Sequence, residues 1–180
     1  MTESRAAVFL DRDGVLNRAI VRGGKPFSPM CVEEFELLAD VESTCAELVA
    51  EGRVLVVVTN QPEIARGRLD FRVVERMHSE LRQRLPVLDV LVCGHDNVDD
   101  CLCRKPKPGM LLEAAARHAL DLTRSVMVGD RASDIAAGKA AGCATVRIGH
   151  GYSAEALGQE ADASADSLHA ALQVILQLTK

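Results

Sequence analysis

Short apolar segments rich in Val, Ile and Leu recur along the chain, and longer segments with a helical period separate them. The short segments are almost continuously apolar, which is typical of parallel strands that are covered on both faces of their sheet. We therefore expect buried strands at residues 6–11, 53–60, 88–94, 125–130 and 144–149.

The longer segments carry apolar residues at positions i, i+3 and i+4, which is the spacing of an amphipathic helix. We expect helices at residues 33–52, 71–85, 109–120, 132–142 and 167–178, with residues 158–166 as a polar connection. His78 is expected to lie on a face of the second helix. Strands that alternate with helices predict right-handed βαβ units. The chain is thus predicted to be an α/β protein with a doubly wound, Rossmann-like parallel sheet.

Length and composition limit the classes of protein to consider. The chain has 180 residues, of which 48% are hydrophobic, so we expect a single domain over residues 1–180 with an ordinary apolar core. The formal net charge of −5 and the lack of a basic stripe argue against a nucleic-acid partner. The apolar runs are too short for a membrane span or a leader segment. We expect a cytoplasmic monomer.

Polar residues stand where three of the expected strands end. Asp11 and Asp13 stand at the end of the first strand, Thr59 at the end of the second, and Asp130 at the end of the fourth. The carboxyl ends of the strands form the ligand site in a doubly wound sheet, so these residues are expected to meet in space. Each motif alone is also typical of a surface turn or a helix cap. Their occurrence together, in this order, favours a shared site.

Converging carboxylates repel one another unless a cation or a proton lies between them. Mg²⁺ would relieve this repulsion, because it prefers oxygen ligands and keeps positions for water and a substrate phosphate. A carboxylate such as Asp11 can then act as a nucleophile toward phosphorus, and Asp13 can act as general acid and base. The Thr59 hydroxyl and the Lys105 ammonium would hold the phosphoryl oxygens. These residues predict phosphoryl-transfer chemistry.

Four motifs together resemble those of the haloacid-dehalogenase-like (HAD) phosphatases: FLDRDGVLN, VVTNQPEIARG, CLCRKPKPGM and VGDRASDIAAGKAAG. The resemblance covers residues 6–150, and it is greatest to the branch that holds heptose-bisphosphate and histidinol-phosphate phosphatases. It implies that Asp11 is the nucleophile and a Mg²⁺ ligand. It further implies that Asp13 is the acid and base, with its backbone carbonyl on the metal, and that Asp130 is the remaining metal carboxylate. Asp134 matches the same motif, either as a site residue or as a structural carboxylate at a helix start.

The resemblance also implies a phosphate-binding set. Thr59 and Asn60 match the phosphate-binding motif, and Lys105 matches the lysine that neutralises the phosphate. Lys107 also precedes a proline and is the alternative to Lys105. The residues at which the family contacts its substrate are Gln61, Arg66 and Arg104.

A cysteine and histidine cluster, Cys93-x-His95 and Cys101-x-Cys103, precedes the lysine. Three thiolates and an imidazole suit a structural, tetrahedral Zn²⁺ with no open position. The spacing differs from the common C-x₂-C knuckle, and three buried cysteines with a solvated histidine are the alternative. The polar sequence between the two pairs argues against burial, and the resembling branch carries such a loop. We expect a zinc-binding loop at residues 93–103.

The links between the first three motifs are too short for the cap domain that many relatives insert. We therefore expect an open site, with specificity determined by the loops at residues 18–30, 61–69 and 94–108. These loops are rich in Arg and Lys, which suits a second phosphate on the substrate. One of them departs from the family, because NQPEIARG has Pro-Glu where Ser-Gly is usual.

The resemblance implies a Mg²⁺-dependent phosphomonoesterase with a small sugar phosphate as its substrate. We expect it to remove the C7 phosphate of a D-glycero-D-manno-heptose 1,7-bisphosphate through an aspartyl-phosphate intermediate. Histidinol phosphate, or another heptose or sugar bisphosphate of a specialised pathway, is the alternative. A further interpretation is a zinc-stabilised binding module without activity, which the intact Asp11, Asp13, Lys105 and Asp130 argue against.

Overall fold

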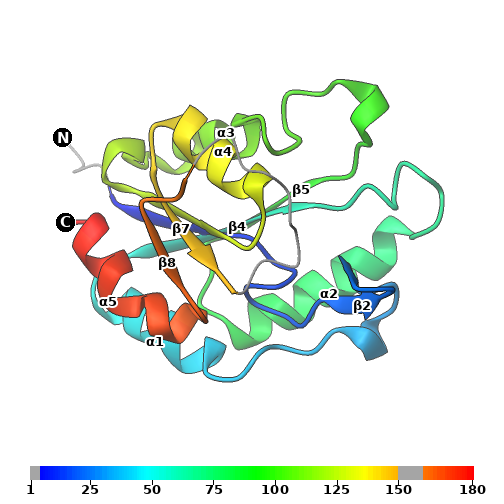
Figure 1. Ribbon diagram of the computed structural model, residues 1–180, viewed down its shortest axis with the longest axis horizontal. Coiled ribbons are helices and arrows are strands. Elements are labelled where there is room, and N and C mark those ends of the chain that lie inside the picture. Colours follow the sequence, from blue (N-terminus) through cyan, green and yellow to red (C-terminus); the bar gives the residue numbers. More distant parts are fainter. Residues whose placement is uncertain (1–4, 150–159) are drawn as a thin grey trace.

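The computed structural model describes residues 5–149 and 160–180, which contain a six-stranded sheet in the order β5-β4-β1-β6-β7-β8 (Figure 1). Every neighbouring pair of strands in this sheet is parallel. The strands are β1 (Ala7–Leu10), β4 (Val54–Asn60), β5 (Asp89–Cys93), β6 (Val126–Gly129), β7 (Ala144–Ile148) and β8 (Ala163–Ala165). The predicted doubly wound α/β sheet is confirmed.

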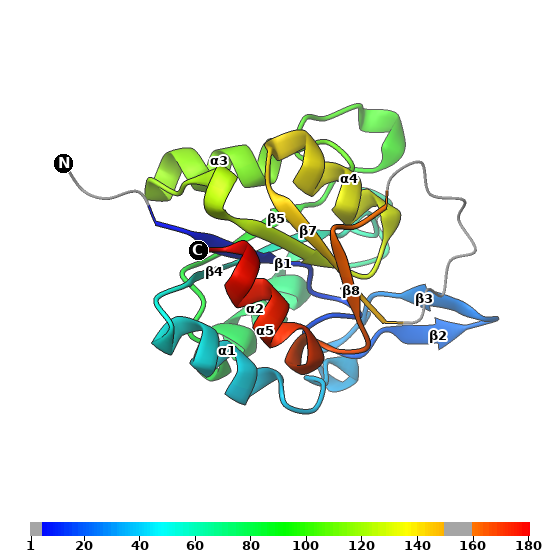
Figure 2. The same cartoon turned by 60° about the vertical axis from the view of Figure 1, so that its left-hand side comes forward.

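Helices cover both faces of the sheet, as Figures 1 and 2 show. On one face lie α1 (Val41–Ala50), α2 (Phe71–Arg84) and α5 (Leu168–Leu178). On the other lie α3 (Gly109–His118) and α4 (Ala132–Ala141). None of these helices, in the part of the chain that the structure describes, is long and apolar enough to cross a membrane.

Strand β1 lies between β4 and β6 and is completely buried, because neighbouring strands cover both edges and helices cover both faces. Its side chains alternate between the two apolar clusters of the core. Val8 and Leu10 belong to the cluster under α1, α2 and α5, whereas Ala7 and Phe9 belong to the cluster under α3 and α4. This alternation follows from the period of two in a strand. It explains why the sequence of β1 is continuously apolar up to the site.

The first helix is shorter than the predicted 33–52, because α1 begins only at Val41. The segment before it contains a 3-10 turn and then pairs with the loop after β1, where Leu38 N–H donates to the carbonyl oxygen of Leu16 at 2.9 Å. Asp40 has a φ of +61°, a left-handed conformation that ends the extended segment and starts the helix. These long-range backbone bonds override the helical period of residues 33–40.

Three short strands were absent from the sequence prediction. Strands β2 (Ile20–Arg22) and β3 (Lys25–Phe27) form a hairpin whose turn residues Gly23 and Gly24 both have positive φ. Such a turn matches the twist of its strands. Figure 2 shows the hairpin projecting from the body of the molecule. Strand β8 lies within the predicted polar connection 158–166 and pairs with β7.

The described residues contain no inserted cap domain. Only the hairpin, the 3-10 turn and α1 separate β1 from β4, and only α2 separates β4 from β5. The carboxyl edge of the sheet therefore opens directly to the surface.

Candidate active site

A cleft with a volume of about 610 Å³ lies at the carboxyl ends of the central strands. Four segments that are distant in the sequence contribute to it, since Asp11 follows β1, Thr59 belongs to β4, and Asp134 lies in the first turn of α4. Lys105 reaches the same place from the loop before α3. The structure thus brings together the strand-end residues that the sequence predicted to meet.

Lys105 is the buried cation of the cleft, with 3% of its surface exposed. Its Nζ lies 2.7 Å from Asp11 Oδ1, 2.6 Å from Asp134 Oδ1 and 2.8 Å from the carbonyl oxygen of Val58. Burial disfavours a charged ammonium, but the two carboxylates outweigh it and raise the pKa of Lys105 above its ordinary value. Lys105 is therefore charged at every physiological pH.

Three carboxylates, those of Asp11, Asp130 and Asp134, place ligand oxygens within 4.8 Å of one another. Burial raises the pKa of Asp11 to about 6, reinforced by the charges of Asp134 and Asp13 and opposed by Lys105. Burial, reinforced by the charges of Asp11 and Asp134, raises the pKa of Asp130 to about 8. Asp130 Oδ1 is buried and has no hydrogen-bond partner among the described residues. Its ion pair with Arg131 Nε is long, at 3.9 Å. Crowded carboxylates with a buried oxygen that accepts no hydrogen bond fit a divalent cation such as Mg²⁺.

Two glycines allow this crowding. A Cβ atom on Gly14 would lie 2.4 Å from Asp130 Oδ2, and one on Gly129 would lie 2.1 Å from the Cβ of Asp134. Gly14 also has a φ of +91°, which other residues rarely adopt. The backbone after β1 can therefore pass directly against the carboxylate of Asp130.

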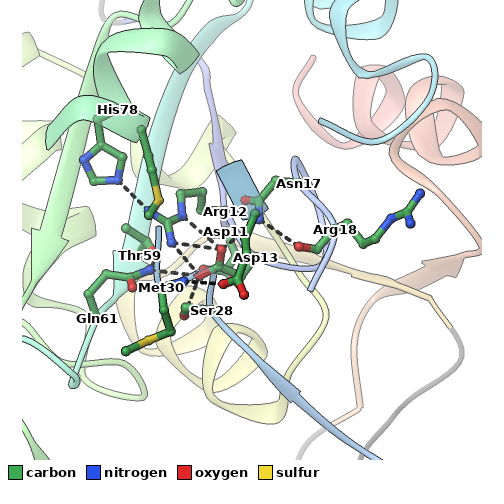
Figure 3. Close-up of polar contacts among 12 residues, drawn as sticks. Asp11, Arg12, Asp13, Asn17, Arg18, Ser28, Met30, Thr59, Gln61 and His78 are labelled. Carbon is green, nitrogen blue, oxygen red and sulfur yellow. Dashed lines mark hydrogen bonds and ion pairs between the residues drawn. The ribbon is translucent and has the colours of Figure 1, made fainter. Parts of the chain in front are cut away.

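The Asp13 carboxylate accepts hydrogen bonds on both oxygens (Figure 3). Oδ1 accepts from Arg12 Nε and Asn17 Nδ2, both at 3.0 Å. Oδ2 accepts from Arg12 Nη2 at 3.0 Å, Gln61 Nε2 at 2.9 Å and Ser28 Oγ at 2.8 Å. Burial alone would raise the pKa of Asp13, but Arg12 and the other donors lower it below its ordinary value. Of these donors, the Ser28 hydroxyl is the one that can also accept a hydrogen bond.

The side chains of Asn60 and Gln61 form hydrogen bonds with other residues of the protein. Asn60 Oδ1 accepts from the backbone N–H of Lys105 at 3.2 Å, and its Nδ2 donates to the carbonyl oxygen of Lys105 at 3.0 Å. Gln61 is fully buried, and its Nε2 donates to Asp13 and to Thr59 Oγ1 at 2.9 Å. Asn60 fixes the backbone that carries the lysine, and Gln61 does not line the cleft.

Arg66 and Arg104 line the cleft and are tied to acidic or polar neighbours. Arg66 forms ion pairs with Glu63 at 2.5 Å and with Asp96 at 2.6 Å. Arg104 Nε donates to Asn97 Oδ1 at 2.7 Å. Arg66 therefore joins the loop after β4 to the loop after β5, whereas Arg104 bonds within the loop after β5.

The cysteine and histidine cluster is compact. The Sγ atoms of Cys93, Cys101 and Cys103 are 3.2–3.7 Å apart, and His95 Nδ1 lies 3.3 Å from Cys103 Sγ and 3.7 Å from Cys93 Sγ. A zinc tetrahedron with Zn–S bonds of about 2.3 Å separates its ligand atoms by roughly 3.7 Å. All six cysteines of the chain are free, so disulfides do not account for the cluster. The four side chains fit a zinc ion.

Lys107 points away from the cleft. Its Nζ lies 2.5 Å from Asp100 Oδ1 and 3.2 Å from the Asp100 carbonyl oxygen. It therefore stabilises the cysteine loop, and Lys105 occupies the position beside Asp11. Asp134 combines both of its expected uses, because Oδ1 contacts Lys105 while Oδ2 accepts from the backbone N–H of Arg131 at 3.0 Å.

Some residues of the cleft were not predicted. Ser28 reaches Asp13 from the segment after the hairpin, and Arg131 reaches the carbonyl oxygen of Pro26 at 3.3 Å. The position of Arg131, directly after Asp130, was a signal that the sequence offered. No sequence pattern indicated that Ser28 would reach Asp13, because this contact depends on how the hairpin folds back.

The fold and the site are those of a HAD-like hydrolase. The family model described as HAD-hydrolase-like matches residues 102–172. The chain is also 34% identical, over 97% of its length and 99% of the relative, to the D-glycero-β-D-manno-heptose-1,7-bisphosphate 7-phosphatase of Pseudomonas aeruginosa. The chain therefore belongs to the haloacid-dehalogenase-like (HAD) phosphatases.

Two further comparisons extend the likeness. The D-glycero-α-D-manno-heptose-1,7-bisphosphate 7-phosphatase of Mycobacterium tuberculosis is 36% identical over 89% of this chain and 86% of the relative. A crystal structure of the D,D-heptose 1,7-bisphosphate phosphatase of B. bronchiseptica, complexed with magnesium and phosphate, is 30% identical. It covers 96% of this chain and 98% of its own, with a TM-score of 0.81. The relatives include names for both the α and the β anomer.

Proposed function

We propose that the protein is a Mg²⁺-dependent phosphomonoesterase that removes the C7 phosphate of a D-glycero-D-manno-heptose 1,7-bisphosphate. The observation that carries this proposal is the contact of Lys105 with Asp11 and Asp134, beside an Asp130 oxygen that accepts no hydrogen bond. This arrangement provides a nucleophile, a fixed cation and a carboxylate site for a metal in one cleft. Similarity to enzymes named for this reaction supports the choice of substrate.

In the first step, an Asp11 carboxylate oxygen attacks the phosphorus, and the bond from phosphorus to the C7 oxygen breaks. Lys105 and Thr59 hold the phosphoryl oxygens, and Asp13 delivers a proton to the departing alcohol. Bound Mg²⁺, held by Asp11, Asp130 and the Asp13 backbone carbonyl, would neutralise charge on the phosphoryl group.

In the second step, Asp13 takes a proton from water, and the resulting nucleophile attacks the phosphorus of the aspartyl phosphate. The bond from phosphorus to the Asp11 oxygen breaks, which regenerates the carboxylate and forms inorganic phosphate. Ser28 Oγ lies 2.8 Å from the Asp13 oxygen at the cleft, so it can stabilise the protonated acid by reversing its hydrogen bond. The same carboxyl thus serves both steps.

Basic side chains around the open cleft suit a substrate with a second phosphate. The lining basic residues are Arg22, Arg66, Arg68, Arg104, Lys105 and Arg131. Since Glu63 and Asp96 form ion pairs with Arg66, we assign the second phosphate to Arg104. Binding at two points would place the C7 phosphate against Asp11.

A substrate panel tests the proposal. It measures kcat/KM on the α and β heptose 1,7-bisphosphates, histidinol phosphate and another sugar bisphosphate, with Mg²⁺ and with chelator. We expect one of the heptose bisphosphates to exceed histidinol phosphate by about 100-fold or more, and activity to require Mg²⁺. A preference for histidinol phosphate would overturn the substrate assignment.

The nucleophile has its own test. Asp11→Asn removes the nucleophilic charge and should lower kcat by about 1,000-fold or more. The control is Asp70→Asn, which alters an exposed helix cap where Asn serves as well as Asp. Full turnover in Asp11→Asn would rule out the aspartyl-phosphate route, and no Mg²⁺-dependent phosphate release from any ester would favour a binding module.

We also propose that Cys93, His95, Cys101 and Cys103 hold a structural Zn²⁺. The loop from 94 to 108 has little apolar contact of its own, and Val98 and Leu102 are exposed. Zinc would fix its shape and hence the position of Arg104. Purified protein should contain about one zinc per chain.

Cys101→Ser should lose that zinc and have a lower melting temperature than the wild type. Cys31→Ser, at a partly buried cysteine outside the cluster, should keep the zinc and the melting temperature of the wild type. Metal analysis and thermal unfolding measure these effects. Zinc content that is low in the wild type, or equal in the two variants, would contradict the assignment.

A further inference from the structure

Arg12 lies between the two catalytic aspartates in the sequence, yet its side chain is completely buried. It points away from the cleft toward α2, as Figure 3 shows. A buried guanidinium is costly unless acceptors surround it. The proposed reaction steps do not use this side chain.

The guanidinium forms a two-point contact with Asp13. Nε donates to Oδ1 and Nη2 donates to Oδ2, each at 3.0 Å. Such a fork fixes the plane of a carboxylate as well as its position. The guanidinium carbon lies over the Phe35 ring, 5.7 Å from the ring centre, so the ring covers one face of the guanidinium. Arg12 thus determines the orientation of the Asp13 carboxylate.

The remaining Nη1 of Arg12 lies 3.0 Å from Nε2 of His78 on α2. Arginine has no acceptor, so His78 Nε2 must accept this bond and carry no proton. Its Nδ1 then carries the hydrogen and lies 3.3 Å from Glu75 Oε1. Burial and the Arg12 charge lower the pKa of His78 to about 4, which agrees with a neutral ring. The hydrogen bond to His78 thus holds the guanidinium through the nitrogen that does not bond to Asp13.

We propose that Arg12 and His78 form a buried positioning pair for Asp13: His78 orients the guanidinium, and the guanidinium orients the acid and base. The proposal rests on the proposed phosphatase activity, because it assigns the pair to the proton transfer of that reaction. His78 was expected to be an ordinary helix-face residue, and it instead connects α2 to the catalytic carboxylate.

The dependence on the leaving group distinguishes positioning from a general structural role. A sugar alkoxide needs a proton as it leaves, whereas p-nitrophenolate leaves readily without one. The ratio kcat/KM reports the steps up to aspartyl-phosphate formation. A fault in the orientation of Asp13 should therefore lower kcat/KM on the sugar phosphate far more than on p-nitrophenyl phosphate.

A matched pair of variants supplies the test. In His78→Gln the side-chain oxygen can take the place of Nε2 and accept from Arg12, whereas in His78→Asn the shorter amide can replace only Nδ1. We expect His78→Asn to lower kcat/KM on the sugar phosphate by about tenfold or more and to change p-nitrophenyl phosphate hydrolysis little. His78→Gln should stay within about threefold of the wild type on both.

Arg12→Lys is the second variant, because it keeps the charge but loses the fork. It should show the same selective loss, and Asp13→Asn provides the reference pattern. Equal losses on both substrates in His78→Asn and Arg12→Lys, or no loss in either, would overturn the inference. Absence of Mg²⁺-dependent turnover in the wild type would instead overturn the proposed function itself. Thermal unfolding of each variant separates loss of activity from loss of fold.

Discussion

Gly14 shows how a single residue determines whether the acidic cluster can form. Its φ of +91° turns the chain after Asp13, and its lack of a side chain lets the backbone pass against Asp130. Gly52 has a similar φ of +80°, but a Cβ there would meet no atom within 4 Å. Both glycines have a positive φ, but only Gly14 lies against another side chain, that of Asp130.

We therefore predict different effects of alanine at the two positions. Gly52→Ala should lower the free energy of unfolding by about 1–2 kcal/mol through left-handed backbone strain and leave Mg²⁺ affinity unchanged. Gly14→Ala should also displace Asp130 and weaken Mg²⁺ binding by about tenfold or more. Calorimetric Mg²⁺ titration and urea unfolding measure the two effects, and equal Mg²⁺ affinities would contradict the role of the close approach.

The raised pKa values of the carboxylates predict how metal binding depends on pH. Without a cation, the pKa of Asp11 is about 6 and that of Asp130 about 8, so protons occupy these groups as the pH falls. Mg²⁺ binds the ionised forms and must displace those protons. The apparent Mg²⁺ affinity should rise from pH 6 to pH 8, by up to about tenfold per pH unit for each displaced proton, and level off above. Affinity that is constant over this range, measured by calorimetry, would contradict the raised values.

Residues at strand ends could be predicted from the sequence because strand geometry determines where they lie. Asp11, Thr59 and Asp130 each terminate an apolar run, and parallel strands bring such ends together. The role of His78 could not be predicted, because its contact with Arg12 spans 66 positions and depends on how α2 packs. Local patterns do not specify which buried side chain faces another across two elements.

Helix α3 is followed by a residue with a strained backbone conformation. Ala119, the residue directly after the helix, is exposed and has a φ of +52°, a conformation that glycine adopts at much lower cost. Gly is the residue usually found at this position of a helix end. The side chain of Ala119 therefore costs stability at this helix end.

We predict that Ala119→Gly raises the free energy of unfolding by about 1 kcal/mol. Ala116→Gly, at an exposed position within the same helix, should lower it by about 1 kcal/mol. Urea unfolding of both variants measures the changes. Changes of the same sign would show that the end of α3 does not have this conformation in solution.

At the scale of elements, the sequence pattern predicted the long buried strands and missed the short exposed ones. Strand β8 has three residues, and its apolar positions are the alanines Ala163 and Ala165, whose small side chains give only a weak hydrophobic signal. It forms because Asp162 accepts from the backbone N–H and the hydroxyl of Thr145 and so holds the segment beside β7. The first helix was predicted to be too long for a similar reason. Residues 33–40 have a helical pattern of apolar positions, but tertiary hydrogen bonds hold them in another conformation.

Across the whole molecule, charge is unevenly distributed. The chain has a formal net charge of −5, but six basic residues and four acidic ones line the cleft. A substrate with two phosphates should therefore be attracted to the cleft against the overall charge. Salt weakens such attraction, because the Debye length falls from about 10 Å at 0.1 M to about 3 Å at 1 M.

We predict that KM for a sugar bisphosphate rises severalfold between low and high KCl concentration. The rise for p-nitrophenyl phosphate, which has one phosphate, should be smaller. Steady-state kinetics at a fixed free Mg²⁺ concentration measure both. An equal rise for the two substrates would show that the cleft does not recognise a second phosphate electrostatically.

The central position of β1 has a consequence for the order of events in folding. Asp11 and Lys105 are 94 positions apart. The acidic cluster joins Asp11, which follows β1, to Asp130, which follows β6, so it needs the pairing of β1 with β6. Contacts between distant segments form late, because the intervening chain must first be ordered. A folding intermediate that lacks this pairing would have most of its helices but no metal affinity. The gain of Mg²⁺ binding during refolding would therefore mark the moment at which β1 pairs with β6.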